Sequence, residues 1–329
     1  MRAMRAAGFT WEPRRIGDVQ LGVWRLKLRN RPAGGAGTAG AAPRRWILIP
    51  GFGDTPLSWM SVLLLLKPFL RSIDEIILLD FPGFQGFLAE EPCFPSLDLM
   101  MDSVMDLMDS LRPEIIMGHS LGGWLAAKYA ADCGQGLRPR GAGAAKQYRG
   151  PRQLILISPS GVFGPDDERQ QFEDVFRRAA EQGIEALRPN LFAREPFWFR
   201  FLAPEFSRFI TREDVVKFLS SVRPEHSVES GIEQIRAEIW LIWGEKDTLV
   251  PARWMNRWLE ILSQSGNHAP QALWLKKLGH SPQVESPVTT AAALAQILNG
   301  YVPHRWGRKL WQTVEVSPSE EALSEGATI

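Results

Sequence analysis

The sequence contains 329 residues, and its 38 basic and 37 acidic side chains leave a formal net charge of only +1. This balance gives no electrostatic footprint for nucleic acid and suits a neutral or apolar small molecule better. The length is at or just beyond the size at which one domain begins to split, so we expect one core with an insertion. The two cysteines, Cys93 and Cys133, show no metal-ligand spacing, which predicts a reduced, cytoplasmic compartment.

The amino terminus is basic, but no apolar segment of signal-peptide length follows it, so we expect no processed leader. The most apolar run, at residues 60–70, is interrupted by Lys67 and Pro68 and is too short to span a bilayer. We therefore expect no stable insertion into a membrane.

Short apolar runs and helical segments alternate along most of the chain. Weak alternation at residues 19–28 predicts an antiparallel strand or hairpin. Continuous apolar runs predict buried strands at residues 46–49, 75–80, 114–117, 153–158, 238–244 and 272–275, the last of which is expected to end the sheet. Such runs, separated by helices, indicate a mostly parallel sheet with helices on both faces. The predicted fold class is therefore α/β.

Apolar periodicity places the helices between these strands. Ser96 is typical of an N-cap, and apolar residues at helical spacing follow it as far as Leu111, with methionines that we expect to fill the core. A second helix begins near Pro56 and is expected to point four residues inward, namely Leu57, Met60, Leu63 and Leu64. A closing helix is predicted at residues 287–298.

Three segments rich in small or polar residues separate or follow these elements. Two Gly- and Ala-rich segments, at residues 30–43 and 134–152, are predicted to be loops. The tail from Gly300 contains Tyr301, Trp306 and Trp311, and we expect it to pack back on the core and then fray, rather than to contact a membrane surface or a partner.

The strand–helix rhythm stops between residues 162 and 231. A charged amphipathic helix is predicted at residues 166–182, aromatic residues and prolines follow it, and a capping box at positions 211–214 predicts a helix that ends at Val222. No strand is expected here. We interpret residues 162–231 as a helical lid and residues 1–161 and 232–329 as the discontinuous core. The lid residues expected to contact a substrate are Phe163, Phe197, Trp198 and Phe201.

The pentapeptide Gly-His-Ser-Leu-Gly at positions 118–122 stands between a predicted strand and a predicted helix. In that context a Gly-x-Ser-x-Gly motif forms a sharp turn that exposes the serine at the end of the sheet. Gly118 and Gly122 leave room for the turn. Ser120 would also lie at a helix N-terminus, where free N–H groups favour developing negative charge. We therefore predict that Ser120 is a nucleophile.

A serine nucleophile needs a base and an acid that orients the base. Among the five histidines, His119 adjoins the serine and is expected to point away from it, whereas only His280 follows a predicted strand. The carboxyl ends of parallel strands share one edge, so Ser120 and His280 should meet there. Asp247 follows another strand at the same edge and is favoured as the acid over its rival, Glu245. For the oxyanion hole we expect the N–H groups of Leu121 and Phe52.

Together these motifs resemble the α/β-hydrolase superfamily. The resemblance covers residues 46–299 apart from the details of the lid, and its segments are residues 51–54, 80–84, 118–123, 244–247 and 279–280. Within the superfamily the chain looks most like lid-bearing esterases and monoacylglycerol-lipase-like members. Two positions depart from relatives: Pro50 replaces a common histidine, and Ser281 replaces a tryptophan that is frequent in carbon–carbon bond hydrolases.

The leading hypothesis is a serine hydrolase that cleaves carboxylic esters with apolar acyl chains and uses no cofactor or metal. A thioesterase, an amidase or a carbon–carbon bond hydrolase could use the same triad, because the triad fixes the reaction type and the pocket fixes the substrate. A ligand-binding or scaffold protein on the same fold is a further alternative.

Overall fold

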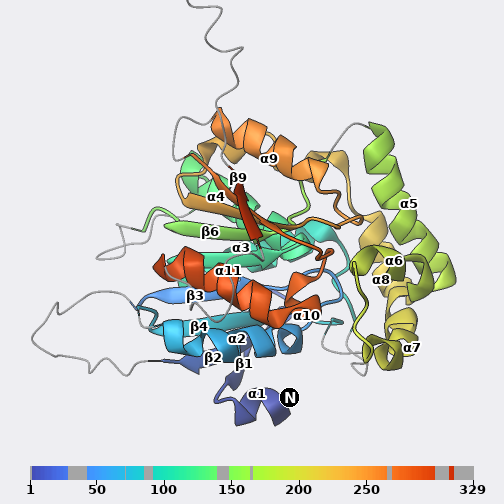
Figure 1. Ribbon diagram of the computed structural model, residues 1–329, viewed down its shortest axis with the longest axis horizontal. Helices are drawn as coiled ribbons and strands as arrows, with labels where there is room; N and C mark the ends of the chain where they lie inside the picture. Colours follow the sequence, from blue (N-terminus) through green and yellow to red (C-terminus); the bar gives the residue numbers. More distant parts are fainter. Residues whose placement is uncertain are drawn as a thin grey trace, which may run out of the picture.

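The computed structural model describes residues 2–28, 43–70, 72–84, 92–138, 148–163, 166–264, 269–300 and 311–314. Residues 30–42 of the first predicted loop, residues 139–147 of the second, and Tyr301 and Trp306 of the tail lie outside the described residues. A central sheet is covered by helices on both faces, and a further group of helices stands at one end of it (Figure 1).

The described strands form one nine-stranded sheet in the order β1-β2-β4-β3-β5-β6-β7-β8-β9. Their bounds are β1 Thr10–Ile16, β2 Val19–Lys27, β3 Arg45–Ile49, β4 Glu75–Asp80, β5 Ile115–His119, β6 Gln153–Ile157, β7 Glu238–Gly244, β8 Gln271–Leu275 and β9 Trp311–Val314. All neighbouring pairs from β4 to β8 are parallel. The predicted α/β fold with a mostly parallel sheet is therefore confirmed.

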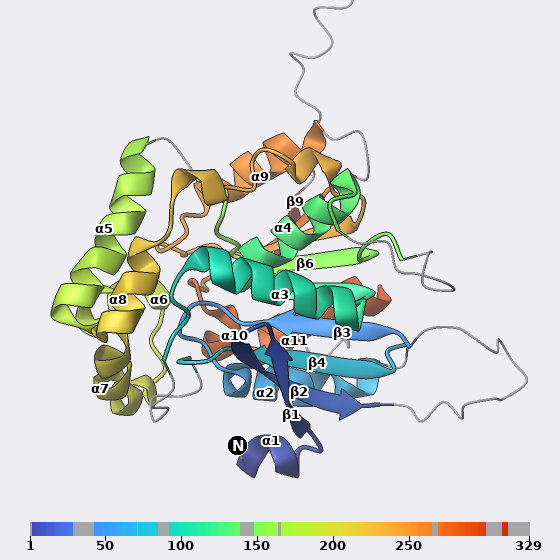
Figure 2. The same cartoon turned by 180° about the vertical axis from the view of Figure 1, so that it is seen from behind.

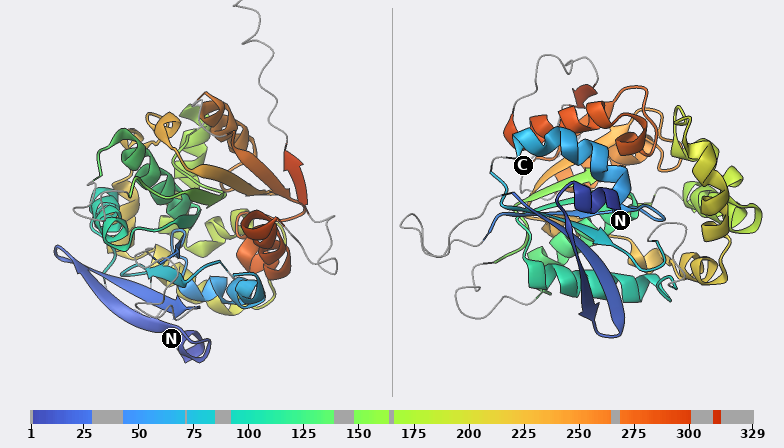
Figure 3. Two further views of the ribbon diagram at one scale, coloured as in Figure 1. Left: turned by 90° about the vertical axis from the view of Figure 1, so that its left-hand side faces the viewer. Right: turned by 90° about the horizontal axis from the view of Figure 1, so that it is seen from below.

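Antiparallel strands stand at both edges of the sheet. β1 and β2 form a hairpin that pairs Ile16 with Val19 and extends from one edge (Figure 3). At the other edge β9 pairs antiparallel with β8, with Leu275 opposite Trp311. The prediction that residues 272–275 end the sheet was therefore wrong, because part of the tail adds one more strand.

Helices cover both faces of the sheet. On one face lie α3 Leu97–Leu111, α4 Leu121–Gln135 and α9 Arg253–Ser263 (Figure 2), and on the other lie α2 Met60–Leu66 and α11 Pro287–Asn299 (Figure 1). Successive side chains of a strand point to opposite faces of the sheet. Ile47 belongs to the hydrophobic cluster under α3 and α4, and Leu48 belongs to the cluster under α2 and α11. Both faces are buried, which is why the strands are apolar throughout.

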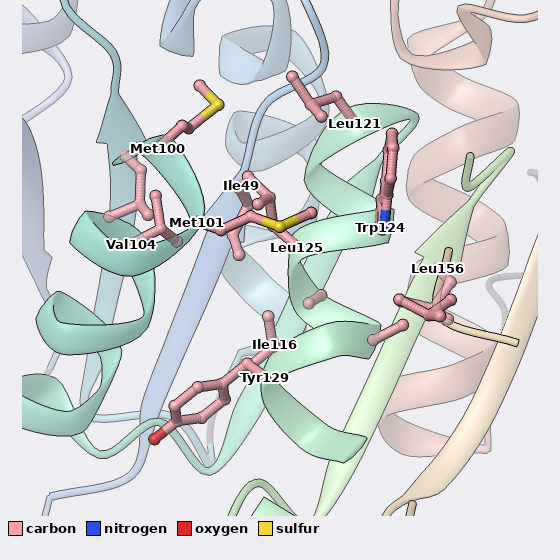
Figure 4. Packing of buried hydrophobic residues seen from close by; sticks show 14 of the residues in the cluster. Ile49, Met100, Met101, Val104, Ile116, Leu121, Trp124, Leu125, Tyr129 and Leu156 are labelled. Atoms are coloured by element: carbon pink, nitrogen blue, oxygen red, sulfur yellow. The ribbon is translucent and has the colours of Figure 1, made fainter. Parts of the chain in front are cut away.

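Helix α3 follows its prediction closely. The Ser96 hydroxyl accepts a hydrogen bond from the Leu99 N–H and caps the helix. Met100 and Met101 point with Val104 toward the α4 side of the sheet, near Ile49 and Leu125 (Figure 4). The methionines are therefore core residues, as expected.

The predicted inward face of the next helix was partly wrong. Leu57 and Leu64 are 47% and 53% exposed, whereas Trp59, Val62 and Leu66 are buried. The segment starts as a 3-10 helix, η1 Pro56–Trp59, and becomes α-helical only in α2. A 3-10 helix has three residues per turn, whereas an α-helix has 3.6. The residues that face the core are therefore different from those expected for a uniform α-helix.

Between β6 and β7 the chain is helical. We call residues 166–231 the helical insertion, which contains α5 Asp166–Gln182, η4 Ile184–Ala186, α6 Arg188–Leu191, α7 Phe199–Ile210, α8 Glu213–Ser220 and η5 Pro224–His226. These helices stand together at the right of Figure 1. The prediction for residues 166–182 is confirmed. Directly after the insertion, η6 Ile232–Gln234 leads into β7.

The predicted capping box at positions 211–214 was wrong. The Thr211 hydroxyl donates to the Ser207 carbonyl at 2.9 Å and so serves the end of α7. Helix α8 begins at Glu213 behind Arg212, with no side-chain cap, and ends at Ser220 rather than Val222. A threonine hydroxyl can donate a hydrogen bond as well as accept one. Here it donates to a carbonyl of the preceding helix, α7, instead of accepting an N–H group of α8.

Three short helices remain among the described residues: α1 Arg2–Ala6 precedes the hairpin, η2 Lys67–Phe69 follows α2, and α10 Pro282–Glu285 precedes α11. No helix in the part of the chain that is described has the length and apolar character needed to cross a bilayer.

Candidate active site

Ser120 occupies a strained turn between β5 and α4. Its φ and ψ angles are 53° and −117°, a backbone conformation that is rare for residues other than glycine. The Ser120 N–H donates to the Ile157 carbonyl at 3.0 Å, and the Ser120 carbonyl accepts from the Trp124 N–H at 3.1 Å. The neighbouring strand and the first helical turn thus hold this conformation.

The two glycines of the motif allow very close approaches. A Cβ atom at Gly118 would lie 2.2 Å from the Gly122 carbonyl oxygen, and one at Gly122 would lie 2.1 Å from the Ile49 carbonyl oxygen. Both distances are far below van der Waals contact. The glycines are therefore needed to pack the start of α4, where Leu121 and Leu125 lie near Ile49, against the sheet (Figure 4).

His280 forms a buried pair with Asp247. The His280 Nδ1 atom lies 2.9 Å from Asp247 Oδ2, and the side chains of the two residues are only 3% and 0% exposed. The other carboxylate oxygen, Oδ1, accepts the N–H groups of Leu249 and Val250, each at 3.0 Å. The loop after β7 thereby fixes the carboxylate, which in turn can orient the imidazole.

Glu245, the rival acid, has a different partner. Its carboxylate accepts the Lys277 N–H at 3.0 Å, and the residue is exposed. Of the two acids that the sequence left open, Asp247 is the one that pairs with His280.

His280 also lies close to the residue that precedes Ser120. The rings of His119 and His280 are 4.9 Å apart between centroids, and the His119 Nε2 atom is 2.8 Å from the His280 carbonyl oxygen. His280 thus lies against the end of β5, the strand that leads into Ser120, although no hydrogen bond joins the Ser120 and His280 side chains, both of which the structure describes. Such bonds often tighten only when substrate binds.

The two residues expected to form an oxyanion hole are Leu121 and Phe52. Leu121 is the first residue of α4, so its N–H has no acceptor within the helix. The Phe52 ring is parallel to the Phe218 ring, with ring centroids 6.1 Å apart, and its centroid lies 5.5 Å from that of Phe209 in the insertion. Their role as oxyanion donors stays a prediction.

The four predicted substrate contacts fall into two groups. Phe163 is buried and lies edge-on to Trp124 of α4, with ring centroids 5.5 Å apart. Phe197, Trp198 and Phe201 are 76%, 39% and 66% exposed on the surface of the insertion. The structure therefore does not bring the four residues together around one buried pocket, and their contact with substrate stays a prediction.

Glu285, which the sequence analysis missed, holds the His280 loop to the insertion. Its carboxylate accepts the N–H groups of Gly279 at 2.8 Å, Ala193 at 3.1 Å and Arg194 at 3.2 Å. Burial is the main cause that raises the pKa of Glu285 above its ordinary value. No sequence pattern signals this link to the insertion, since Ala193 and Arg194 lie 92 and 91 positions from Glu285.

Comparison with known proteins places this geometry in a family. Residues 46–293 match the sequence profile of the alpha/beta hydrolase family, which is well over half of the chain. The chain belongs to the alpha/beta hydrolase family. A search of curated protein sequences gives no match.

Solved structures share the fold of this alpha/beta hydrolase. A membrane phospholipase A, described as a bacterial virulence factor, is 20% identical with a TM-score of 0.60, over 91% of this chain and 88% of that one. A thermophilic esterase from Thermogutta terrifontis is 16% identical with a TM-score of 0.58, over 89% and 98%. An esterase from Exiguobacterium antarcticum is 14% identical with a TM-score of 0.61, over 88% and 98%. At these identities the likeness concerns the fold alone.

Proposed function

We propose that this alpha/beta hydrolase is a serine hydrolase that cleaves carboxylic esters with apolar acyl chains. The observation that carries the proposal is the buried pair of His280 and Asp247, 2.9 Å apart, beside the strained turn that holds Ser120. A histidine whose Nδ1 faces a fixed carboxylate presents Nε2 as a base, which is what a serine nucleophile requires. The esterases and the phospholipase among the structural neighbours agree with this reaction class.

The reaction would proceed in two halves. Ser120 Oγ attacks the ester carbonyl carbon while His280 Nε2 takes the hydroxyl proton, and Asp247 stabilises the imidazolium. The N–H groups of Phe52 and Leu121 bind the oxyanion. The intermediate then expels the alcohol, which receives the proton from His280, and leaves an acyl group on Ser120. Water, deprotonated by His280, attacks this acyl-enzyme, and the acid leaves as the serine regains its proton.

We further propose that residues 162–231 act as a lid on the core formed by residues 1–161 and 232–329. Hydrogen bonds between the insertion and the His280 loop support this role: besides the Glu285 contacts, the Ser281 N–H donates to the Leu191 carbonyl at 3.2 Å. Phe163, Phe197, Trp198 and Phe201 are the proposed contacts for the acyl chain. A cytoplasmic location stays a prediction.

Replacement of the nucleophile tests the proposed reaction. Ser120→Ala should lower kcat for a chromogenic short-chain ester by about 10⁴-fold or more, because only binding and the oxyanion donors would remain. Ser110→Ala, which alters a hydroxyl that hydrogen-bonds to the Leu107 carbonyl on α3, is the matched control and should leave turnover unchanged. Ester hydrolysis at the wild-type rate by Ser120→Ala would refute the assignment. Rates on a thioester and on an amide with the same acyl group as the ester would distinguish an esterase from a thioesterase or an amidase.

A further inference from the structure

A largely buried polar cluster that the reaction does not use lies against the His280 backbone. It consists of Asp54 from the loop after β3, His119 from the end of β5, and Gln283 from α10. The His119 and Gln283 residues are 4% and 1% exposed. The cluster therefore joins three chain segments that meet at the same edge of the sheet.

The hydrogen bond between His119 and His280 fixes the state of the His119 ring. The His280 carbonyl oxygen can only accept, so the His119 Nε2 atom, 2.8 Å away, must carry the proton. The Nδ1 atom of the neutral ring is then an acceptor, and the Gln283 side-chain amide lies 3.4 Å from it. The pKa of His119 is lowered to about 3, with burial as the largest cause and the nearby His280 as the second. His119 thus remains a neutral donor and does not compete with His280 for the proton in catalysis.

The same ring contacts the loop that carries Phe52. A Cβ atom at Gly51 would lie 2.9 Å from the His119 Nδ1 atom and 3.3 Å from the Ser120 Cβ atom, so this backbone packs directly on both side chains. Asp54 Oδ2 lies 3.9 Å from the same Nδ1 atom. His119 therefore touches the oxyanion loop on one side and the His280 backbone on the other, and its own chain continues into Ser120.

We propose that His119 is a positioning residue, whose Nε2–H holds the His280 backbone and thereby sets the distance between the His280 imidazole and the Ser120 hydroxyl. This inference rests on the proposed serine hydrolase function. A displacement of about 1 Å in such a site costs on the order of 10²-fold in rate. The side chain acts through the main chain of another residue and does not touch the substrate.

Two substitutions at position 119 separate this role from simple core packing. His119→Leu removes the Nε2 donor, whereas His119→Gln places an amide N–H near the same point and preserves it. We expect His119→Leu to lower kcat per active site by about 100-fold with KM changed less than about 3-fold, and His119→Gln to recover most of the loss. Active sites are counted by the fraction of protein that a fluorophosphonate labels, so that unfolded molecules do not contribute.

His226 supplies a control for the loss of a buried histidine. Its Nε2 atom is 2.9 Å from Asp98 Oδ1 and its Nδ1 atom accepts the Arg223 N–H at 3.1 Å, in the insertion. His226→Leu should lower Tm but leave kcat per labelled site unchanged. Hydrogen exchange adds a readout that does not depend on turnover: exchange at residues 279–285 should accelerate in His119→Leu and stay near the wild-type rate in His119→Gln.

Each outcome decides the proposal. An active wild type whose His119→Leu variant keeps its kcat per site would overturn the positioning role alone, and so would equal losses in the leucine and glutamine variants. A wild type that neither turns over an ester nor reacts with the fluorophosphonate would overturn the ester hydrolase assignment and the positioning role together. Loss in the leucine variant with recovery in the glutamine variant supports the proposal.

Discussion

Asp54 is a carboxylate that the fold keeps largely out of water. Its Oδ1 atom accepts the Thr55 N–H at 2.7 Å, but Oδ2 has no hydrogen-bond partner among the groups that the structure describes. Burial is the main cause that raises the pKa of Asp54 from 3.8 to about 6, and nearby donors offset it only in part. Between these values the folded protein holds a proton that the unfolded chain has released.

The sign of the pH effect follows from this proton. Stability must fall as pH rises through the window from about 4 to about 6, because there the folded state binds more protons than the unfolded state. Asp54→Asn removes the ionisation. Relative to the wild type, the variant should therefore gain about 2 kcal/mol of unfolding free energy between pH 4 and pH 8. Denaturant titrations at both pH values measure it, and an equal difference at both would contradict the assignment.

At the scale of elements, the sequence predicted best where a pattern repeats over several residues. The bounds of β4, α5 and α3 agree with their apolar patterns, because burial on one or both faces dictates the residues directly. The failures occurred where two local structures compete. Leu57 and Leu64 point outward because the helix starts as a 3-10 turn, and the Thr211 hydroxyl serves the helix before it rather than the helix after it.

The contact between α4 and β3 depends on Gly122. A Cβ atom there would approach the Ile49 carbonyl oxygen to 2.1 Å, and backbone cannot move aside cheaply. Gly122→Ala should lower the unfolding free energy by about 3 kcal/mol or more, at the upper end of overpacking effects. Gly17→Ala is the control, because nothing lies within 4 Å of the added Cβ atom. Only the positive φ angle of 55° disfavours alanine there, so the unfolding free energy should fall by only about 1 kcal/mol. Denaturant unfolding measures both, and equal losses would contradict the close-packing account.

At the scale of the whole molecule, the parallel sheet brings together side chains that are far apart in the sequence. The positions of Ser120, Asp247 and His280 could be predicted because each follows a strand, and parallel strands end at one edge. The contact of His119 with the His280 carbonyl could not be predicted, because the two residues are 161 positions apart and no local sequence pattern links them. The exposure of Phe197 and Phe201 could not be predicted either, because it depends on how the helices of the insertion pack against one another and the core.

Mapping the site of covalent modification by a fluorophosphonate tests the central claim, that the His280–Asp247 pair primes Ser120 for nucleophilic attack. Intact-mass and peptide analysis of the wild-type protein should find one adduct, located on Ser120. Ser120→Ala should give none, and His280→Gln should react at least about 100-fold more slowly, because the general base is lost. An adduct on another residue, or labelling of Ser120 at the same rate without His280, would contradict the account.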